Sequence, residues 1–339
     1  MNGNTPAALT NHLTQAKQLA ANRLLRPNYF ANVVGVGIGK KVVSGDATPT
    51  YCVRVYVVSK LDLEDLSPAT TVPSSFLDVP TDIIEVGRFG RTGRRPKPAQ
   101  NQGKGAEADP TPRPGSPISV KTNAPNVNQG FLGTLGAMVQ AGSGPNDPRY
   151  ILSCNHVLAV NGRVPQDAEI VSAEFVGEEK ALADPGPFVP LQRDGSNSVD
   201  CAVARLKDLA LVLPAFPKDT LTLSLGAPID PLLDMQVKKV GAATGPTEGK
   251  IVDVDADLYI DYSFGTFRFE HQVMIDSGSD DADFATLGDS GSLVVDTSTK
   301  RSTAMIFAAS GRFAVACPVG IALEKLAAEL KVPKLSVVV

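Results

Sequence analysis

The chain has 339 residues, 43% of them hydrophobic, which is enough material for two domains with cores of their own. Its formal net charge of −4 provides no broad basic surface, which argues against nucleic acid as the main partner. The N-terminal segment lacks the charged-then-apolar pattern of a signal peptide, and no stretch approaches roughly 18 uninterrupted apolar residues. We therefore expect a cytoplasmic protein with no membrane partner.

Residues 1–90 combine one helical pattern with three strand-like segments. Apolar residues recur at helical spacing between residues 5 and 25, at Leu9, Leu13, Ala16, Leu19, Ala20 and Leu24. Strand-like segments follow at 33–43, 51–58 and 81–86. The pattern predicts a small α/β module, which could inhibit the rest of the chain, recruit a substrate or a regulatory partner, or drive assembly into a homo-oligomer.

Residues 91–117 are expected to form a flexible linker, because the composition shifts to Gly, Pro, Arg, Lys and Gln without apolar periodicity. The shift begins near residue 87, and its first part is basic through Arg88, Arg91, Arg94 and Arg95. Such a segment can be a solvated tether or an exposed site for tryptic-type cleavage, and both interpretations stay open.

Residues 118–339 alternate short strand-like segments with turns and end in a helical pattern. The strand-like segments are LGAMV, YILSCN, DCAVARL, MQVKKV, FRFEHQVMI, SLVVD and STAMIFAA. Regular short strands of this kind are typical of a pair of β-barrels. A helix over 319–330 is predicted by the spacing of Ala322, Leu323, Leu326 and Leu330.

Three short motifs in this region carry chemistry in a fixed order. His156 follows a strand-like segment, Asp200 opens another, and Ser290 lies between glycines in Gly288-Asp289-Ser290-Gly291-Ser292. A serine hydroxyl needs an imidazole to take its proton, and the imidazole needs a carboxylate to fix its tautomer. His156 and Asp200 are the candidates for these roles. The glycines allow the amides of Gly288 and Ser290 to converge on a developing oxyanion.

Each of these residues has an ordinary structural alternative. The chain has three histidines, and we expect His12 to be a solvated helix residue and His271 to have a structural or surface role. His156 could be a core histidine, Asp200 could cap a turn, and Ser290 could be a turn serine. Weaker rivals for the acidic role are Asp184, Asp194 and Asp208.

Other motifs do not support a metal or a cofactor, and we expect neither. Asp253, Asp255 and Asp257 have calcium-loop spacing, but the glycine and glutamate that an EF-hand needs are missing. The segment 35–40 lacks both nucleotide-binding spacings and fits a glycine-punctuated strand. The four cysteines, Cys52, Cys154, Cys201 and Cys317, are scattered and fit reduced thiols in a cytosol. Cys154 and Cys201 lie beside the proposed site in the sequence, which predicts sensitivity to thiol oxidants.

The ordered motifs resemble those of trypsin-like serine peptidases of the chymotrypsin fold. The matching segments are 150–158 around the histidine, 200–206 after the aspartate, 241–249 (GAATGPTEG) and 287–294 (LGDSGSLV). The closest branch is the intracellular, disulfide-free one that includes the plant narrow-leaf protein and bacterial relatives. The resemblance implies two six-stranded antiparallel β-barrels with a C-terminal helix. It also implies a substrate pocket near Phe284, Ala309 and Ser310, suited to an apolar or small side chain.

The chain departs from secreted members of this family in three places. Cys154-Asn155 stands where an alanine pair is common, Ser292 stands where glycine is usual, and no segment resembles the Ile-Val-Gly-Gly start of an activated enzyme. We expect an intracellular serine endopeptidase that cleaves a protein or peptide substrate without zymogen activation of the digestive type. The alternatives are a catalytically latent binding scaffold and a self-processing phage or assembly protease.

Overall fold

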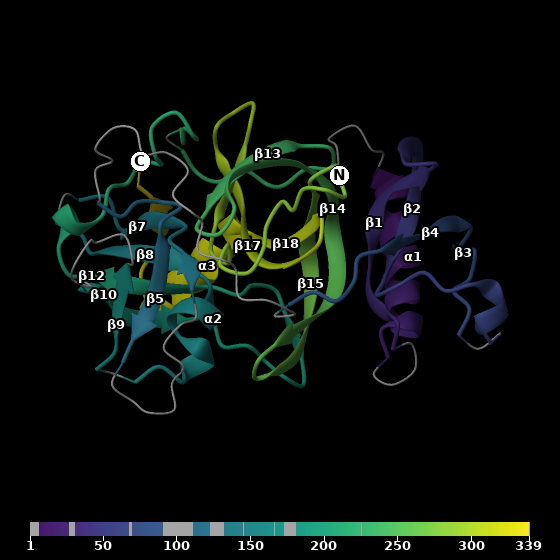
Figure 1. Cartoon of the computed structure of the whole chain (residues 1–339), viewed down its shortest axis with the longest axis horizontal. Helices are drawn as coiled ribbons and strands as arrows, with labels where there is room; N and C mark the ends of the chain where they lie inside the picture. Colours follow the sequence, from purple (N-terminus) through teal and green to yellow (C-terminus); the bar gives the residue numbers. More distant parts are fainter. Residues whose placement is uncertain are drawn as a thin grey trace.

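The computed structural model describes residues 7–26, 31–67, 70–90, 111–122, 132–144, 146–165, 167–172, 181–224 and 226–338. Strands dominate, and helices α1 (Ala7–Leu24) and α3 (Val319–Leu330) lie near the two ends of the chain (Figure 1). The predicted mainly-β class with a C-terminal helix is confirmed. None of the helices in these ranges has the length and apolar character needed to cross a bilayer.

The first barrel is a closed ring of antiparallel pairings. Its strands are β5 (Pro117–Lys121), β6 (Gly133–Thr134), β7 (Ala137–Ala141), β8 (Arg149–Ser153), β9 (Glu169–Ser172), β10 (Ala181–Phe188) and β12 (Ala202–Leu206). Hydrogen-bonded pairs run β7-β8-β12-β10-β9-β5-β6. Because β6 and β7 are separated only by Leu135 and Gly136, they act as one bent strand and close a ring of six.

The second barrel closes in the same way. Its strands are β13 (Gln236–Gly241), β14 (Gly245–Tyr262), β15 (Gly265–Asp276), β16 (Leu293–Asp296), β17 (Ser302–Ser310) and β18 (Phe313–Pro318). Antiparallel pairs run β13-β14-β15-β18-β17-β16 and return to β13. A short strand, β11 (Ser196–Asn197), pairs in parallel with β15 and so ties the segment before Asp200 to this barrel.

The C-terminal helix α3 packs against β10 and β17, and so contacts both barrels. Its buried face consists of Val319, Ala322, Leu323, Leu326 and Ala327. The helix ends at Lys331 in a left-handed conformation, after which β19 (Leu335–Val337) pairs with β7. The described residues also form three short 3-10 turns, which are η1 (Leu63–Asp65), η2 (Val160–Gly162) and η3 (Leu209–Leu211).

The N-terminal module contains α1, β1 (Val33–Val43), β2 (Asp46–Val57), β3 (Ser75–Phe76) and β4 (Val79–Glu85). The hairpin between β1 and β2 turns at Ser44 and Gly45, both with positive φ. Leu13, Ala16, Ala20 and Leu24 of the predicted helix stripe are buried, whereas Leu9 and Leu19 are 39% and 46% exposed. The buried face is therefore narrower than the pattern suggested.

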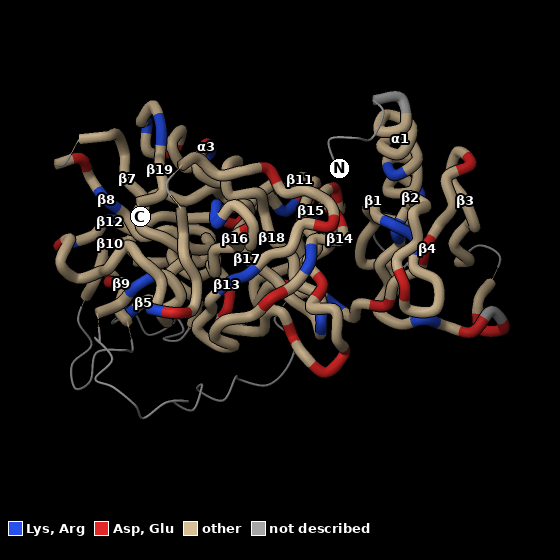
Figure 2. Tube along the Cα trace, turned by 90° about the horizontal axis from the view of Figure 1, so that it is seen from above, with Lys and Arg blue, Asp and Glu red and all other residues tan. Residues whose placement is uncertain are grey.

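Strand β1 pairs with β14, so the module and the second barrel share one sheet (Figures 1 and 2). The glycine-punctuated strand makes this junction possible. A Cβ at Gly37 would lie 1.8 Å from Asp253 Oδ2, and one at Gly35 would lie 2.2 Å from Leu258 Cδ2. Gly35 and Gly37 therefore provide close packing against β14.

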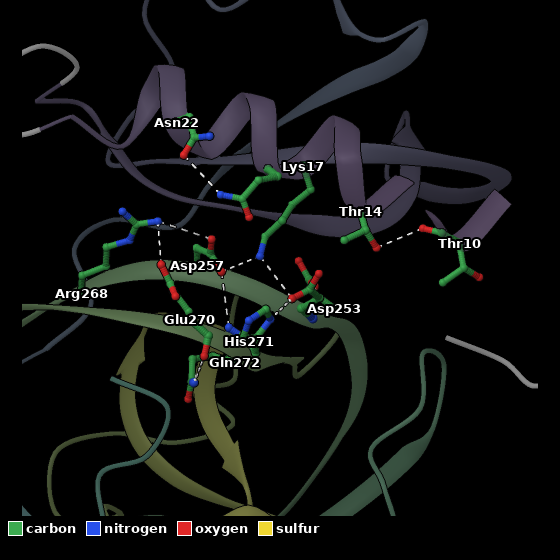
Figure 3. Close-up of polar contacts among 12 residues, drawn as sticks. Thr10, Thr14, Lys17, Asn22, Asp253, Asp257, Arg268, Glu270, His271 and Gln272 are labelled. Carbon is green, nitrogen blue, oxygen red and sulfur yellow. Dashed lines mark hydrogen bonds and ion pairs between the residues drawn. The ribbon is translucent and has the colours of Figure 1, made fainter. Parts of the chain in front are cut away.

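A buried cation of α1 also holds the module on β14 (Figure 3). Lys17 Nζ lies 2.5 Å from Asp257 Oδ1 and 3.2 Å from Asp255 Oδ1, and Lys17 is 1% exposed. His271, on β15, places its Nδ1 2.6 Å from Asp255 Oδ1. Asp253, Asp255 and Asp257 therefore bind protein groups along an extended strand and do not form a calcium loop.

The residues just before the predicted linker and the last residues of the linker are packed. Phe89 is fully buried, and Asp261 N donates to its carbonyl at 3.0 Å, while Gly90 bridges to Asp261. At the other end, Leu213 N donates to Pro112 O at 2.8 Å, so residues 111–117 belong to the packed structure. The interpretation of Arg91, Arg94 and Arg95 as part of a tether concerns positions outside the described residues.

Candidate active site

His156 and Asp200 meet because their strands are neighbours. His156 lies in the short helix α2 (Asn155–Leu158) directly after β8, and Asp200 comes directly before β12. The register pairs Ser153 with Ala202. His156 Nδ1 consequently lies 2.6 Å from Asp200 Oδ2, and His156 N donates to Oδ1 at 3.2 Å.

Asp200 is fully buried and has three donors. The third is the hydroxyl of Tyr262, which donates to Oδ2 at 2.6 Å. Burial alone would raise the pKa of Asp200, but the charge and hydrogen bonds of His156 and the hydroxyl of Tyr262 outweigh it, so the pKa lies below its usual value. The carboxylate therefore stays ionised and fixes the proton of His156 on Nδ1.

The departure Cys154-Asn155 has a local explanation. The Asn155 side chain accepts from Asn161 N at 2.9 Å and donates to Val189 O at 2.7 Å, which fixes the turn after His156. Cys154 Sγ donates to Ile306 O at 3.2 Å. The same carbonyl accepts from Gly291 N at 2.7 Å, so the histidine turn and the serine loop are attached to one point of β17.

The serine loop is held from several sides. Thr134 N donates to Ser290 O and Thr134 Oγ1 donates to Gly288 O, both at 2.8 Å. Gly291 has φ of 97°, and a Cβ there would lie 2.1 Å from Ser153 Oγ. Only glycine fits between β6 and β8 at this point.

Behind the loop, Asp289 is fully buried and accepts several hydrogen bonds. Its donors are Ala243 N at 2.9 Å, Thr244 N at 3.2 Å, Thr244 Oγ1 at 2.8 Å and Thr286 N at 3.0 Å. Lys239 Nζ lies 3.3 Å from Asp289 Oδ2 and is itself buried. Burial lowers the pKa of Lys239, although Asp289 opposes the shift. The carboxylate that precedes Ser290 is thus bound by an internal lysine.

The amides of Gly288 and Ser290 donate no hydrogen bond to any described residue. Ser290 is half-buried, and its Oγ has no hydrogen-bond partner in the described ranges, His156 included. The structure therefore joins His156 to Asp200 directly and brings the serine loop to the same carbonyl of β17, without a bond between Ser290 and His156.

The three residues predicted for the substrate pocket occupy different environments. Phe284 is fully buried in a cluster with Val237, Ile251 and Ile275, and it has no surface open to a ligand in this structure. Ala309 and Ser310 are half-buried near the end of β17. A Cβ at Gly87 would lie 2.7 Å from Ser310 Oγ, so the exit from the N-terminal module passes beside Ser310.

The cysteines differ from expectation. Cys154 and Cys201 are fully buried, and burial raises the pKa of both thiols well above the usual value. Neutral, buried thiols react slowly, which argues against the predicted oxidant sensitivity in the folded protein. The two remaining histidines lie outside the site: His12 is exposed on α1, and His271 is exposed while it binds Asp255.

Among the residues that the structure describes, two groups of side chains come close enough together to suggest a metal, but neither suits one. Cys154, His156 and Asp200 form the first group, in which the thiol stays protonated and Asp200 is saturated with donors. Asp255, Asp257 and His271 form the second, and the ammonium of Lys17 supplies the cation there.

Sequence reasoning did not identify Tyr262, Thr134 or Lys239. Tyr262 ends β14 in the second barrel, far from Asp200 in sequence. Lys239 lies in the apolar segment MQVKKV, and the strand alternation that puts Val237 inside also places Lys239 inside. That alternation was the available signal.

Comparison with known proteins gives similarities at low identity. No family model matches the chain. It is 24% identical over 301 residues to Protein NARROW LEAF 1 of Oryza sativa subsp. japonica, an alignment that covers 78% of this chain and 48% of the rice protein. The chain thus spans about half the length of the curated relative it matches.

Among solved structures, Thermobifida fusca Protease A matches with a TM-score of 0.43 and 16% identity, covering 66% of this chain and 98% of that protein. Nocardiopsis protease matches with a TM-score of 0.43 and 13% identity, covering 67% of this chain and 98% of that protein. The MamO protease domain from Magnetospirillum magneticum matches with a TM-score of 0.38 and 15% identity, covering 61% of this chain and 94% of that domain.

Proposed function

We propose that this protein is a serine endopeptidase that uses Ser290 as nucleophile, His156 as general base and acid, and Asp200 to orient the imidazole. The observation that carries the proposal is the 2.6 Å contact between His156 Nδ1 and the fully buried Asp200 Oδ2. This contact supports an imidazole whose Nε2 is free to accept a proton. The serine loop adds support, because Gly291 N donates to Ile306 O of β17, the carbonyl that also accepts from Cys154 Sγ of the histidine turn.

In the proposed reaction, Ser290 Oγ attacks the substrate carbonyl while its proton passes to His156 Nε2. The new oxyanion accepts hydrogen bonds from the amides of Gly288 and Ser290, neither of which donates to a residue that the structure describes. Collapse of the tetrahedral intermediate expels the amine, which takes the proton from His156, and leaves an acyl group on Ser290. Water then attacks the acyl carbonyl by the same route, with His156 again accepting and returning a proton.

A latent scaffold is the second candidate, and it is favoured by one observation. Ser290 Oγ makes no hydrogen bond to His156 in the resting structure. Catalytic hydrogen bonds are often long or absent without substrate, so a rotation of the serine side chain can be sufficient. The endopeptidase remains the better-supported proposal because Asp200 and His156 already have the required contact.

The proposed substrate is a protein or peptide, and the proposed location is the cytoplasm. Four buried, unpaired cysteines support a reducing compartment. The N-terminal module is proposed to be a regulatory or assembly element. Its continuous sheet with the second barrel supports an effect on the site through β14.

The test is active-site labelling with a fluorophosphonate, read by intact mass and peptide mapping. The wild type should gain one label on the peptide that contains Ser290, and Ser290→Ala should gain none. Ser279→Ala, which alters an exposed loop serine, is the matched control and should label like the wild type. If the wild type stays unlabelled at every pH between about 6 and about 9, the endopeptidase proposal fails in favour of the scaffold.

A further inference from the structure

Tyr262 connects the second barrel to the carboxylate of the first. It is the last residue of β14, and its hydroxyl donates to Asp200 Oδ2 at 2.6 Å. The same oxygen accepts from His156 Nδ1 at 2.6 Å. One atom of Asp200 therefore holds the imidazole and the phenol together, and their positions depend on each other.

The ring of Tyr262 is fixed by aromatic neighbours. Its centroid lies 5.3 Å from that of His156 at an interplanar angle of 61°, an edge-on contact. Phe264 stacks on the other side at 5.2 Å, and Phe267 approaches edge-on at 5.6 Å. The guanidinium of Arg163 lies 5.1 Å from the Phe264 ring, which extends the stack to the first barrel. The hydroxyl therefore cannot swing away from Asp200 without disturbing this cluster.

We propose that Tyr262 is a positioning residue for the proposed endopeptidase: its hydroxyl fixes the carboxylate of Asp200 and moderates the charge that His156 experiences. This inference rests on the proposed function. Of the two Asp200 oxygens, Oδ1 is fixed by His156 N, while Oδ2 has the imidazole and the phenol. The positive end of the O–H dipole at Oδ2 offsets part of the carboxylate charge. Without it, that charge favours a protonated imidazole more strongly.

The other titratable side chains around His156 and Asp200 do not mask the effect of the Tyr262 hydroxyl. Cys154, Cys201 and Cys317 each interact electrostatically with Asp200, and burial raises the pKa of each thiol, that of Cys317 to about 12. Burial, followed by the charge of Asp200, also raises the pKa of Tyr262 well above its usual value, so the phenol remains a donor. These groups therefore do not mask a change in the His156–Asp200 pair in the neutral range.

Tyr262→Phe removes the hydroxyl and keeps the ring, and Tyr259→Phe is the matched control. Tyr259 lies on the same strand, and its hydroxyl donates to Leu25 O at 3.1 Å, away from the site. We would measure fluorophosphonate labelling rates against pH. For Tyr262→Phe, the acid limb should move to higher pH by about half a unit to one unit, which lowers the rate below the midpoint by about threefold to tenfold and restores it at alkaline pH. Tyr259→Phe should overlay the wild type.

A second readout separates this inference from the proposed function. The imidazole signal of His156 can be followed by NMR across the same pH range, because the chain has three histidines and His156→Gln identifies the signal. If the wild type is not labelled but the NMR titration of His156 moves in Tyr262→Phe alone, the positioning role of Tyr262 is supported and the endopeptidase proposal fails. Superimposed titrations and rate profiles in all three proteins overturn the role of Tyr262.

If Tyr262→Phe does not fold, the wild type still decides the question. The phenolic proton of Tyr262 and the Nδ1 proton of His156 bind one oxygen, so a nuclear Overhauser effect between two downfield protons is expected. Its absence would overturn the shared contact from which the role is inferred.

Discussion

The ammonium of Lys239 and the carboxylate of Asp289 form an ion pair, 3.3 Å apart, in which neither side chain has exposed surface. Lys239 also donates to Thr244 Oγ1 and to Gly245 O. The pair lies directly behind Ser290, because Asp289 is its neighbour in the chain. The conformation of the serine loop is thereby tied to a residue of β13.

Replacement of Lys239 by methionine should destabilise the protein and reduce labelling of Ser290. The variant leaves a buried carboxylate without its cation, which costs about 3 kcal/mol of unfolding free energy. Lys238→Met is the control, since Lys238 is the neighbouring lysine and pairs with Glu248 at the surface. It should change stability by less than about 1 kcal/mol. Urea unfolding measures both variants, and equal transition midpoints would contradict a structural role for the buried pair.

Substitution of Gly291 by alanine should disrupt the serine loop. The new Cβ would lie 2.1 Å from Ser153 Oγ and 2.4 Å from Thr134 O, at a φ of 97°. Strain and overpacking together should cost about 3 kcal/mol. Gly320→Ala is the opposite case, because its Cβ meets nothing within 4 Å on an exposed position of α3. It should gain about 0.5 to 1 kcal/mol. The midpoint of thermal unfolding should therefore fall in Gly291→Ala and rise in Gly320→Ala.

The four thiols should be unreactive until the protein unfolds. Burial raises the pKa of Cys52 and of Cys317 to about 12, and it raises the pKa of Cys154 and of Cys201 well above the usual value. Reaction with a chromogenic disulfide reagent at neutral pH should therefore be complete in denaturant and negligible in its absence. Fast modification of the folded protein at one cysteine would show that its surroundings open.

The meeting of His156 and Asp200 could be predicted because both follow simple rules. Each residue adjoins an apolar strand, and neighbouring antiparallel strands bring such ends together. Tyr262 could not be found in this way. Its reach to Asp200 depends on the length of β14, an 18-residue strand, and on how the two barrels pack. Neither quantity is encoded in a local pattern.

Lys17 illustrates the second limit of sequence reasoning. The helical stripe of apolar residues assigned Leu9 and Leu19 to the buried face, but the face that packs contains Leu13, Lys17 and Ala20. A lysine in a buried stripe requires an acidic partner, and the alternating aspartates of β14 supply it. The two halves of the pair are more than 200 residues apart, so each looks like a surface charge when considered alone.

Lys17→Met should weaken the docking of the N-terminal module on β14. The substitution leaves Asp257, whose side chain is 2% exposed, without its nearest cation, which should cost about 3 kcal/mol. Arg23→Met, an exposed change near the end of α1, is the control and should be nearly neutral. Amide hydrogen exchange can localise the effect. Faster exchange in α1 and β1, with the first barrel unchanged, is expected, whereas uniform exchange rates in the two variants would contradict it.

The buried carboxyl group of Asp253 should make the stability of the protein fall as the pH rises. The side chain is fully buried and accepts from Tyr56 Oη at 2.7 Å, and burial raises its pKa from 3.8 to about 6. Between these two values the folded protein keeps a proton that the unfolded chain releases. The unfolding free energy contributed by this group is therefore complete below about pH 4 and is lost as the pH rises through about 6, by about 3 kcal/mol in total.

Asp253→Asn has no proton to lose, so the comparison isolates this contribution. The wild type should gain about 3 kcal/mol relative to the variant as the pH falls from about 7 to about 4. Asp62→Asn, which alters an exposed aspartate, should show no such trend against the wild type. Urea unfolding at several pH values provides the measurement. A difference between wild type and Asp253→Asn that stays constant with pH would mean that Asp253 is ionised in the folded protein throughout, held so by Arg54, whose charge lowers the pKa of Asp253.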